Sequence, residues 1–123
     1  VCYTHRNYMK RYEEKNGLKL SSVRVVGGGA VSDVWMQMMA DILQVKIEIP
    51  ESPRYTGAMG AYYCAMVGLG KIENYDAVYE AVKISKTFNP RSEYAKTYEK
   101  LFNVYTKLYP ALSGLYDELN GKY

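Results

Sequence analysis

The chain has few of the side chains that metal centres and disulfide frameworks require. Its 123 residues include one histidine and two cysteines, and Cys2 and Cys64 lie far apart in the sequence. This spacing matches neither a zinc motif nor a disulfide framework, so we expect no metal ligands and two reduced, buried thiols. Reduced thiols are typical of a cytoplasmic protein. No nucleophile–base pair or carboxylate pair stands out, so the sequence offers no candidate catalytic residue.

Long apolar runs and a strong charge imbalance are also absent. No stretch approaches the roughly 18 apolar residues that a membrane span needs, and no signal peptide is visible. The formal net charge is +3, with lysine and glutamate interspersed along the chain. We therefore expect neither a membrane nor a nucleic acid as a partner. The length suits one domain, over residues 1–123.

The chain begins at Val1, inside a predicted helix, and without an initial methionine. We therefore expect a piece of a longer protein, truncated on its N-terminal side. Such a piece should leave the first helix and the first strand without some of their neighbours. An exposed apolar face, or a homodimer that covers it, is the expected consequence.

The most informative stretch runs from Val23 to Leu43. A short β-branched run predicts a buried strand over residues 23–26, and three consecutive glycines follow it. Apolar residues then recur at helical spacing, at Val31, Val34, Trp35, Met38, Met39, Ile42 and Leu43. A strand, a turn and a helix in this order direct backbone amides and a helix N-terminus at one point, which suits a phosphate group.

Gly27, Gly28, Gly29 and Ala30 are the strongest candidate site. Without Cβ atoms, backbone N–H groups can approach an anionic or flat ligand directly. Ser32 and Asp33 follow in the first helical turn, where an acceptor side chain caps free N–H groups and a negative charge suits the helix dipole. The glycines match neither a P-loop nor a Rossmann fingerprint. The residues alone therefore leave two interpretations open, a nucleotide or phosphate site and a purely structural turn.

The remaining pattern predicts helices around a short sheet, which makes the chain an α/β protein. We expect helices over residues 1–16, 57–67 and 74–82, and a half-exposed strand over residues 45–49. Residues 84–88 are expected to be extended and irregular. A long helix should follow, with Asn89 as its N-cap and Pro90 at its first position, and Pro110 should kink or split it. Asp41 is expected to be a solvated residue of the second helix.

Small residues recur on one face of the helix predicted over residues 57–67. They lie at Gly57, Gly60, Ala61 and Cys64. Glycine inside a helix costs about 1 kcal/mol relative to alanine, so these positions need a reason. Close packing against another backbone is the interpretation that we favour, and close approach to a ligand is the alternative.

Taken together, three motifs resemble the C-terminal end of the FGGY family of carbohydrate kinases, with the nearest likeness to xylulokinases. They are RVVGGGAVSDVWMQMMADIL followed by VKIEIP, then GAMGAYYCAMVGLG, and a tyrosine-rich tail that contains LYPAL. The resemblance covers essentially the whole chain. It implies a part of an actin-like, ribonuclease-H-like ATPase domain from an enzyme that transfers the γ-phosphate of ATP to a sugar or polyol hydroxyl.

The resemblance also implies the role of each candidate residue. Gly27 to Ala30 would lie against the nucleotide, with Gly28 and Gly29 touching phosphate or ribose, and Ser32 and Asp33 would lie at the adenine edge. The helix with the small residues would pack behind the nucleotide. The catalytic aspartate, the sugar-binding residues and most of the Mg²⁺ site would belong to parts of a kinase that this chain does not contain. We therefore expect the 123 residues alone to be inactive.

A second hypothesis is a non-enzymatic interaction domain. The last helix carries tyrosines and leucines at three–four spacing from Tyr94 to Leu119. Such a stripe can pair with another chain, and the glycine turn would then be structural only.

Overall fold

A small mixed sheet forms the centre of the computed structural model, which describes residues 1–121 apart from the side chains of Ala77 and Glu80. The domain predicted over residues 1–123 thus includes two residues that lie outside the described part. Within residues 1–121 the strand order is β1 (Ser22–Arg24), β2 (Lys46–Pro50) and β3 (Ile84–Phe88). β2 pairs parallel with β1 and antiparallel with β3. The predicted α/β class is therefore confirmed.

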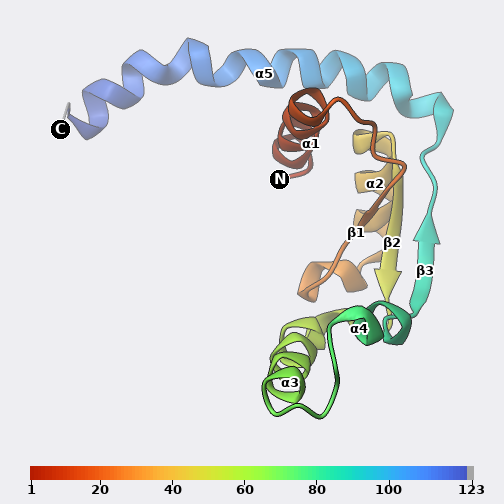
Figure 1. Cartoon of the computed structure of the whole chain (residues 1–123). Coiled ribbons are helices and arrows are strands. Elements are labelled where there is room, and N and C mark those ends of the chain that lie inside the picture. The colour runs from red at the N-terminus through yellow and green to blue at the C-terminus, as the bar shows by residue number, and fades with distance from the viewer. Residues whose placement is uncertain (122–123) are drawn as a thin grey trace.

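Helices lie at both ends of this sheet and along it (Figure 1). α1 (Cys2–Asn16) lies beside the long α5 (Ser92–Asn120) at one end of the sheet, and α2 (Asp33–Leu43) packs along β2. α3 (Thr56–Gly68) and α4 (Asp76–Ala81) lie together at the opposite end. The second half of α5 extends beyond the rest of the molecule.

The core lies between α2 and β2. Alternation along β2 buries Ile47 and Ile49, as the apolar–polar pattern predicts. The buried face of α2 differs from the predicted one, because Val34 is 76% exposed and Met36 only 1%. The buried apolar side chains are Cys2, Ala30, Met36, Met39, Ala40, Ile42, Leu43, Val45, Ile47, Ile49 and Phe102.

Several predicted boundaries are wrong. β1 begins one residue earlier than predicted and ends at Arg24, and α4 covers only the middle of residues 74–82. Residues 84–88 are not irregular, because they form a ladder with β2 from Ile47 to Pro50. The register of that ladder includes a shift at Ile49 and Pro50, which a period-two pattern does not predict.

The start and the middle of α5 also differ from the prediction. The N-cap is Arg91 and not Asn89, because Arg91 is extended at φ −94° and ψ 118°. Pro110 is predicted to kink or split this helix; the helix runs unbroken to Asn120, so the split is wrong. The predicted C-terminal cap of α1 is confirmed, since Gly17 adopts φ 62° and donates its N–H to the Glu13 carbonyl.

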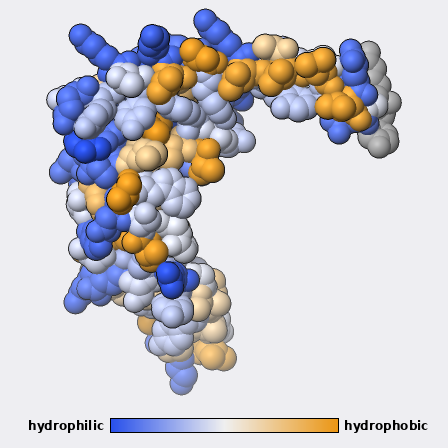
Figure 2. All heavy atoms as spheres, turned by 180° about the vertical axis from the view of Figure 1, so that it is seen from behind, coloured by the Kyte–Doolittle hydropathy of each residue, from blue (hydrophilic) through white to orange (hydrophobic). Residues whose placement is uncertain are grey.

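The exposed apolar face expected from the sequence is present. Beside β1 lies an open hollow of about 480 Å³, lined among others by Tyr8, Tyr12, Val23, Val25 and Val26. Figure 2 shows a second apolar strip along the projecting half of α5. Of the two cysteines, Cys2 is buried as predicted and Cys64 is exposed, which corrects the prediction. Among residues 1–121 no helix is both long enough and apolar enough to cross a membrane.

Candidate nucleotide-binding turn

The glycine turn connects β1 to α2 through a single 3-10 turn, Gly28–Val31. Gly27 begins it at φ 97°, a left-handed conformation that glycine adopts without strain. The Gly27 N–H donates to the Pro53 carbonyl at 2.8 Å, and the Ala30 N–H donates back to the Gly27 carbonyl at 3.2 Å. The amides of Gly28 and Gly29 therefore precede the first hydrogen bond of the turn, as at any helix N-terminus.

The three glycines have different structural requirements. Gly27 needs its left-handed φ. Gly29 needs space, because a Cβ there would lie 2.3 Å from the ring of Trp35. Among the described atoms, none lies within 4 Å of a Cβ placed on Gly28, and the φ of Gly28 is not positive. The fold therefore explains the first and third glycines and leaves the second without a structural reason.

Ser32 and Asp33 start α2 as the sequence predicts. The Ser32 hydroxyl accepts from the Trp35 N–H at 3.3 Å, so Ser32 is the N-cap of α2. Asp33 is the first residue of the helix and receives the Lys86 ammonium at 2.7 and 2.9 Å. Both side chains of this ion pair are more than half exposed. Ala30 is 2% exposed, so its side chain belongs to the core and not to the open surface of the turn.

This arrangement suits a ligand that combines negative charge with polar groups. The positive end of α2 and the leading amides of the turn favour an anion. The Asp33 carboxylate would repel a phosphate placed next to it, and Lys86 offsets that charge. Lys86 comes from β3, far away in sequence, and only the ladder between β2 and β3 brings it to the turn. Sequence reasoning therefore missed Lys86.

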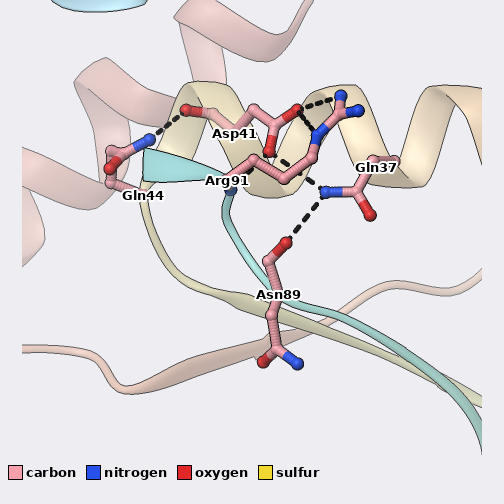
Figure 3. Close-up of polar contacts among 5 residues, drawn as sticks. All are labelled: Gln37, Asp41, Gln44, Asn89 and Arg91. Carbon is pink, nitrogen blue, oxygen red and sulfur yellow. Dashed lines mark hydrogen bonds and ion pairs between the residues drawn. The ribbon is translucent and has the colours of Figure 1, made fainter. Parts of the chain in front are cut away.

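A buried polar network fixes the other end of α2 (Figure 3). Asp41 is fully buried and accepts from the Arg91 backbone N–H at 2.8 Å and from the guanidinium at 2.6 and 3.0 Å. Gln37 donates to the same carboxylate at 3.0 Å and to the Asn89 carbonyl at 2.8 Å. The prediction that Asp41 is solvated is wrong. The sequence offers one hint of this ion pair, an arginine directly before a long helix.

The network determines the protonation of Asp41. Burial raises the pKa of this carboxyl, because a desolvated charge is unfavourable. The hydrogen bonds from Arg91 and Gln37 favour the ionised form and outweigh burial, so the pKa of Asp41 lies below its ordinary value. The hydrogen bond to the Asp41 carboxylate raises the pKa of Arg91 in return. The ionised pair joins α2, which begins at the glycine turn, to the start of α5.

The glycines on the small-residue face of α3 are not closely approached by another backbone within the described part of the chain. A Cβ on Gly57 or Gly60 would meet no atom within 4 Å, and Cys64 is exposed. The interpretation favoured from the sequence, close packing against another backbone, is therefore wrong for residues 1–121. α3 does begin beside the glycine turn, because Pro53, the acceptor for Gly27, lies in the short 3-10 turn, Pro53–Tyr55, that leads into it.

A glycine turn between a strand and a helix on an α/β scaffold defines the fold class, and comparison with known proteins defines the family. The model of the FGGY family of carbohydrate kinases, C-terminal domain, matches residues 1–69. The chain therefore belongs to the FGGY family of carbohydrate kinases.

Individual relatives carry different sugar kinase names. A gluconokinase of Bacillus licheniformis is 35% identical over 86 residues, which are 70% of this chain and 17% of the relative. An L-xylulose/3-keto-L-gulonate kinase of Escherichia coli is 33% identical over 106 residues, which are 85% of this chain and 21% of the relative. The chain thus spans about a fifth of the length of these relatives.

Solved structures support the fold. A ligand-bound xylulose kinase from Lactobacillus acidophilus superposes with a TM-score of 0.75 at 24% sequence identity, covering 93% of this chain and 24% of that one. At this identity the likeness concerns the fold alone. The match covers nearly the whole chain, so the mixed sheet and its helices form an arrangement that also occurs within that larger chain.

Proposed function

We propose that this chain is the nucleotide-binding part of an FGGY kinase that transfers the γ-phosphate of ATP to a sugar hydroxyl. The observation that carries the proposal is Gly28, a glycine that the fold itself does not require. A side chain at this position would extend into the open space in front of the turn. Absence of a side chain there is what close approach of a phosphate needs.

The proposal gives each residue of the turn a role. The amides of Gly28 and Gly29 donate to phosphate or ribose oxygens, and Gly27 sets the direction of the turn. Ser32 lies at the adenine edge, although its hydroxyl oxygen already accepts a hydrogen bond as the helix cap. Asp33 suits the neutral ribose or adenine better than the phosphates, because it is a carboxylate held by Lys86.

The described residues do not form a magnesium site. Among residues 1–121 no group of three His, Cys, Asp or Glu side chains could hold a metal ion. Asp33 is paired with the Lys86 side chain, and Asp41 is paired with the Arg91 side chain. In our proposal Mg²⁺, the catalytic aspartate and the sugar are therefore held by other parts of the kinase, and phosphoryl transfer needs all of them. We propose residues 1–123 as one part of a single nucleotide-binding domain in the cytoplasm.

For the sugar, we propose xylulose or a related ketose or polyol. Support comes from a relative named for L-xylulose. Gluconokinase and glycerol kinase are the competing names among the relatives. Phosphorylation of xylulose, gluconate and glycerol by a longer kinase polypeptide that carries this segment decides among them.

Binding of MgADP to such a polypeptide tests the site itself. We expect Gly28→Val to weaken binding at least tenfold, because three added carbon atoms occupy the position of the phosphate. Gly114→Val is the matched control, since a Cβ there also meets no atom within 4 Å. Both variants should unfold at the same temperature as the unchanged protein. Equal affinity of the Gly28→Val variant and the control would refute the proposed site.

A specific observation favours a second function, self-association through α5. Apolar residues recur at alternating spacings of four and three along this helix. They are Leu101, Tyr105, Leu108, Leu112, Leu115 and Leu119, and the five leucines are between 37% and 80% exposed. We propose that a second copy of this chain covers the projecting half of α5.

Sedimentation of the 123-residue chain tests this second function. We expect a dimer that Leu112→Glu dissociates, because the substitution buries a charge in the apolar contact. Asn103→Glu adds the same charge on the opposite side of α5, where Asn103 is exposed, and should leave the dimer intact. A monomer at all concentrations would refute the proposal, and so would a dimer that is insensitive to Leu112→Glu.

A further inference from the structure

Trp35 is the only tryptophan of the chain, and it touches three elements. Its backbone N–H is capped by the Ser32 hydroxyl, its ring lies against Gly29, and its indole N–H donates to the Cys2 thiol at 3.3 Å. One side chain therefore links α1, the glycine turn and the start of α2. No residue that we propose to touch the nucleotide links all three of these elements.

The contact between Trp35 and Gly29 is close enough to fix the turn. A Cβ on Gly29 would lie 2.3, 3.0 and 3.1 Å from three ring atoms, which leaves no room for both groups. The ring thus fills the space beside the backbone of the turn. Because rotation of the Gly29 peptide plane would bring it against the ring, the ring restricts the directions available to the turn amides.

Cys2 also restricts the orientation of the Trp35 ring. The Cys2 side chain is 8% exposed within the core, and its sulfur accepts the indole N–H. α1 packs on α2, so the sulfur is held at a fixed position relative to the helix that carries Trp35. A thiol is a weak acceptor, but it is the acceptor that the structure gives to this indole N–H. The indole therefore has a preferred orientation over Gly29.

From these contacts we infer that Trp35, oriented by Cys2, is a positioning residue that holds the amides of Gly28 and Gly29 in the direction needed for a nucleotide phosphate. The inference rests on the proposed function, since it assigns the turn to nucleotide. Trp35 does not touch the phosphate and acts through Gly29. Displacement of a binding group by about 1 Å can cost up to two orders of magnitude in function, so loss of this support should be measurable.

Amide hydrogen exchange in the 123-residue chain tests the positioning without any nucleotide. We expect Trp35→Ala to accelerate exchange at least tenfold at the hydrogen-bonded amides of the turn, those of Gly27 and Ala30. Val34→Ala is the control, because Val34 is the neighbouring residue and 76% exposed. Cys2→Ala should accelerate exchange at the same amides, and Cys2→Ser should restore protection, because serine keeps an acceptor. Unchanged exchange in the Trp35→Ala variant would overturn the inference.

A double-mutant cycle in a longer kinase polypeptide that carries this segment tests the link to nucleotide. Trp35→Ala should raise the KM for ATP about tenfold and leave the KM for the sugar unchanged. Gly29→Ala should raise the KM for ATP when Trp35 is present and add little in the Trp35→Ala background, because the two groups compete for one space. Equal increases in both KM values, or additive effects, would overturn the inference.

The two proposals fail in different ways. If Gly28→Val leaves MgADP binding unchanged, the proposed nucleotide site is wrong, whatever Trp35 does. If Gly28→Val abolishes binding while Trp35→Ala affects neither exchange nor the KM for ATP, the site is right and the positioning role is wrong. Quenching of the Trp35 fluorescence by MgADP, with the Trp35→Phe variant as the blank, reports on the turn directly.

Discussion

Neutralising Asp41 tests the largest difference between the sequence-based expectation and the structure. Two aspartates of α2 each face a cation, but Asp41 is fully buried whereas the Asp33 side chain is 57% exposed. Removing one partner of a buried ion pair costs about 3–5 kcal/mol, because the other charge stays desolvated. The Arg91 side chain is 46% exposed and can regain water, so we expect the lower end, about 3 kcal/mol, for Asp41→Asn.

The matched control is Asp33→Asn on the same helix. An exposed ion pair contributes less than about 1 kcal/mol, so this variant should keep nearly full stability. Urea unfolding of the two variants and the unchanged chain, followed by circular dichroism at pH 7, gives the three free energies of unfolding. A loss in Asp41→Asn no larger than that in Asp33→Asn would refute the reasoning.

The same network predicts how stability depends on pH. The pKa of Asp41 is lower in the folded chain than in the unfolded chain, where it is about 3.9. The unfolded chain therefore binds a proton first on acidification, and stability falls as the pH drops through that value towards the folded pKa. Asp41→Asn should remove this part of the acid sensitivity. An acid unfolding profile identical in the variant and the unchanged chain would contradict the assigned ion pair.

Other outcomes follow from the glycine turn, the core and the limited extent of the chain. Gly27→Ala should lower the free energy of unfolding by about 1–2 kcal/mol, because its φ of 97° is strained for alanine, whereas Gly28→Ala should change it by less than about 0.5 kcal/mol. Phe102→Ala should cost about 3 kcal/mol, because Phe102 is 3% exposed, whereas Leu119→Ala at 80% exposure should cost almost nothing in the monomer. Coupled-assay measurements should detect no sugar phosphorylation by the 123 residues alone, and measurable turnover would contradict the assignment of catalysis to other parts of a kinase.

Short-range patterns predicted the local structure well. The alternation of residues 45–49 and the Ser32 cap depend on neighbours within a few residues, and both are confirmed. The α1 end at Gly17 is confirmed for the same reason. The family also follows from sequence, because the order and separation of its motifs are properties of the chain and not of its packing.

Long-range contacts account for what the sequence did not predict. Asp41 lies outside the apolar stripe predicted for its helix, so the sequence indicates a solvent-exposed residue. Its charge is buried because Arg91, which follows β3 in the chain, pairs with it and offsets the cost of desolvation. The sequence of β3 has only a weak local pattern, so it is predicted to be irregular. Its hydrogen bonds to β2 make it a strand. Lys86 reaches Asp33 through the same pairing.

The amino-acid sequence by itself determined the α/β class, the glycine turn and the family. A turn between strand and helix needs only the residues that form it, so Gly27 to Asp33 could be located without coordinates. The tertiary structure decided what each glycine is for, because the requirement at Gly29 comes from the Trp35 ring and the freedom at Gly28 from the absence of any neighbour. A side chain's space is defined by atoms that surround it in three dimensions, and the order of residues does not specify those atoms.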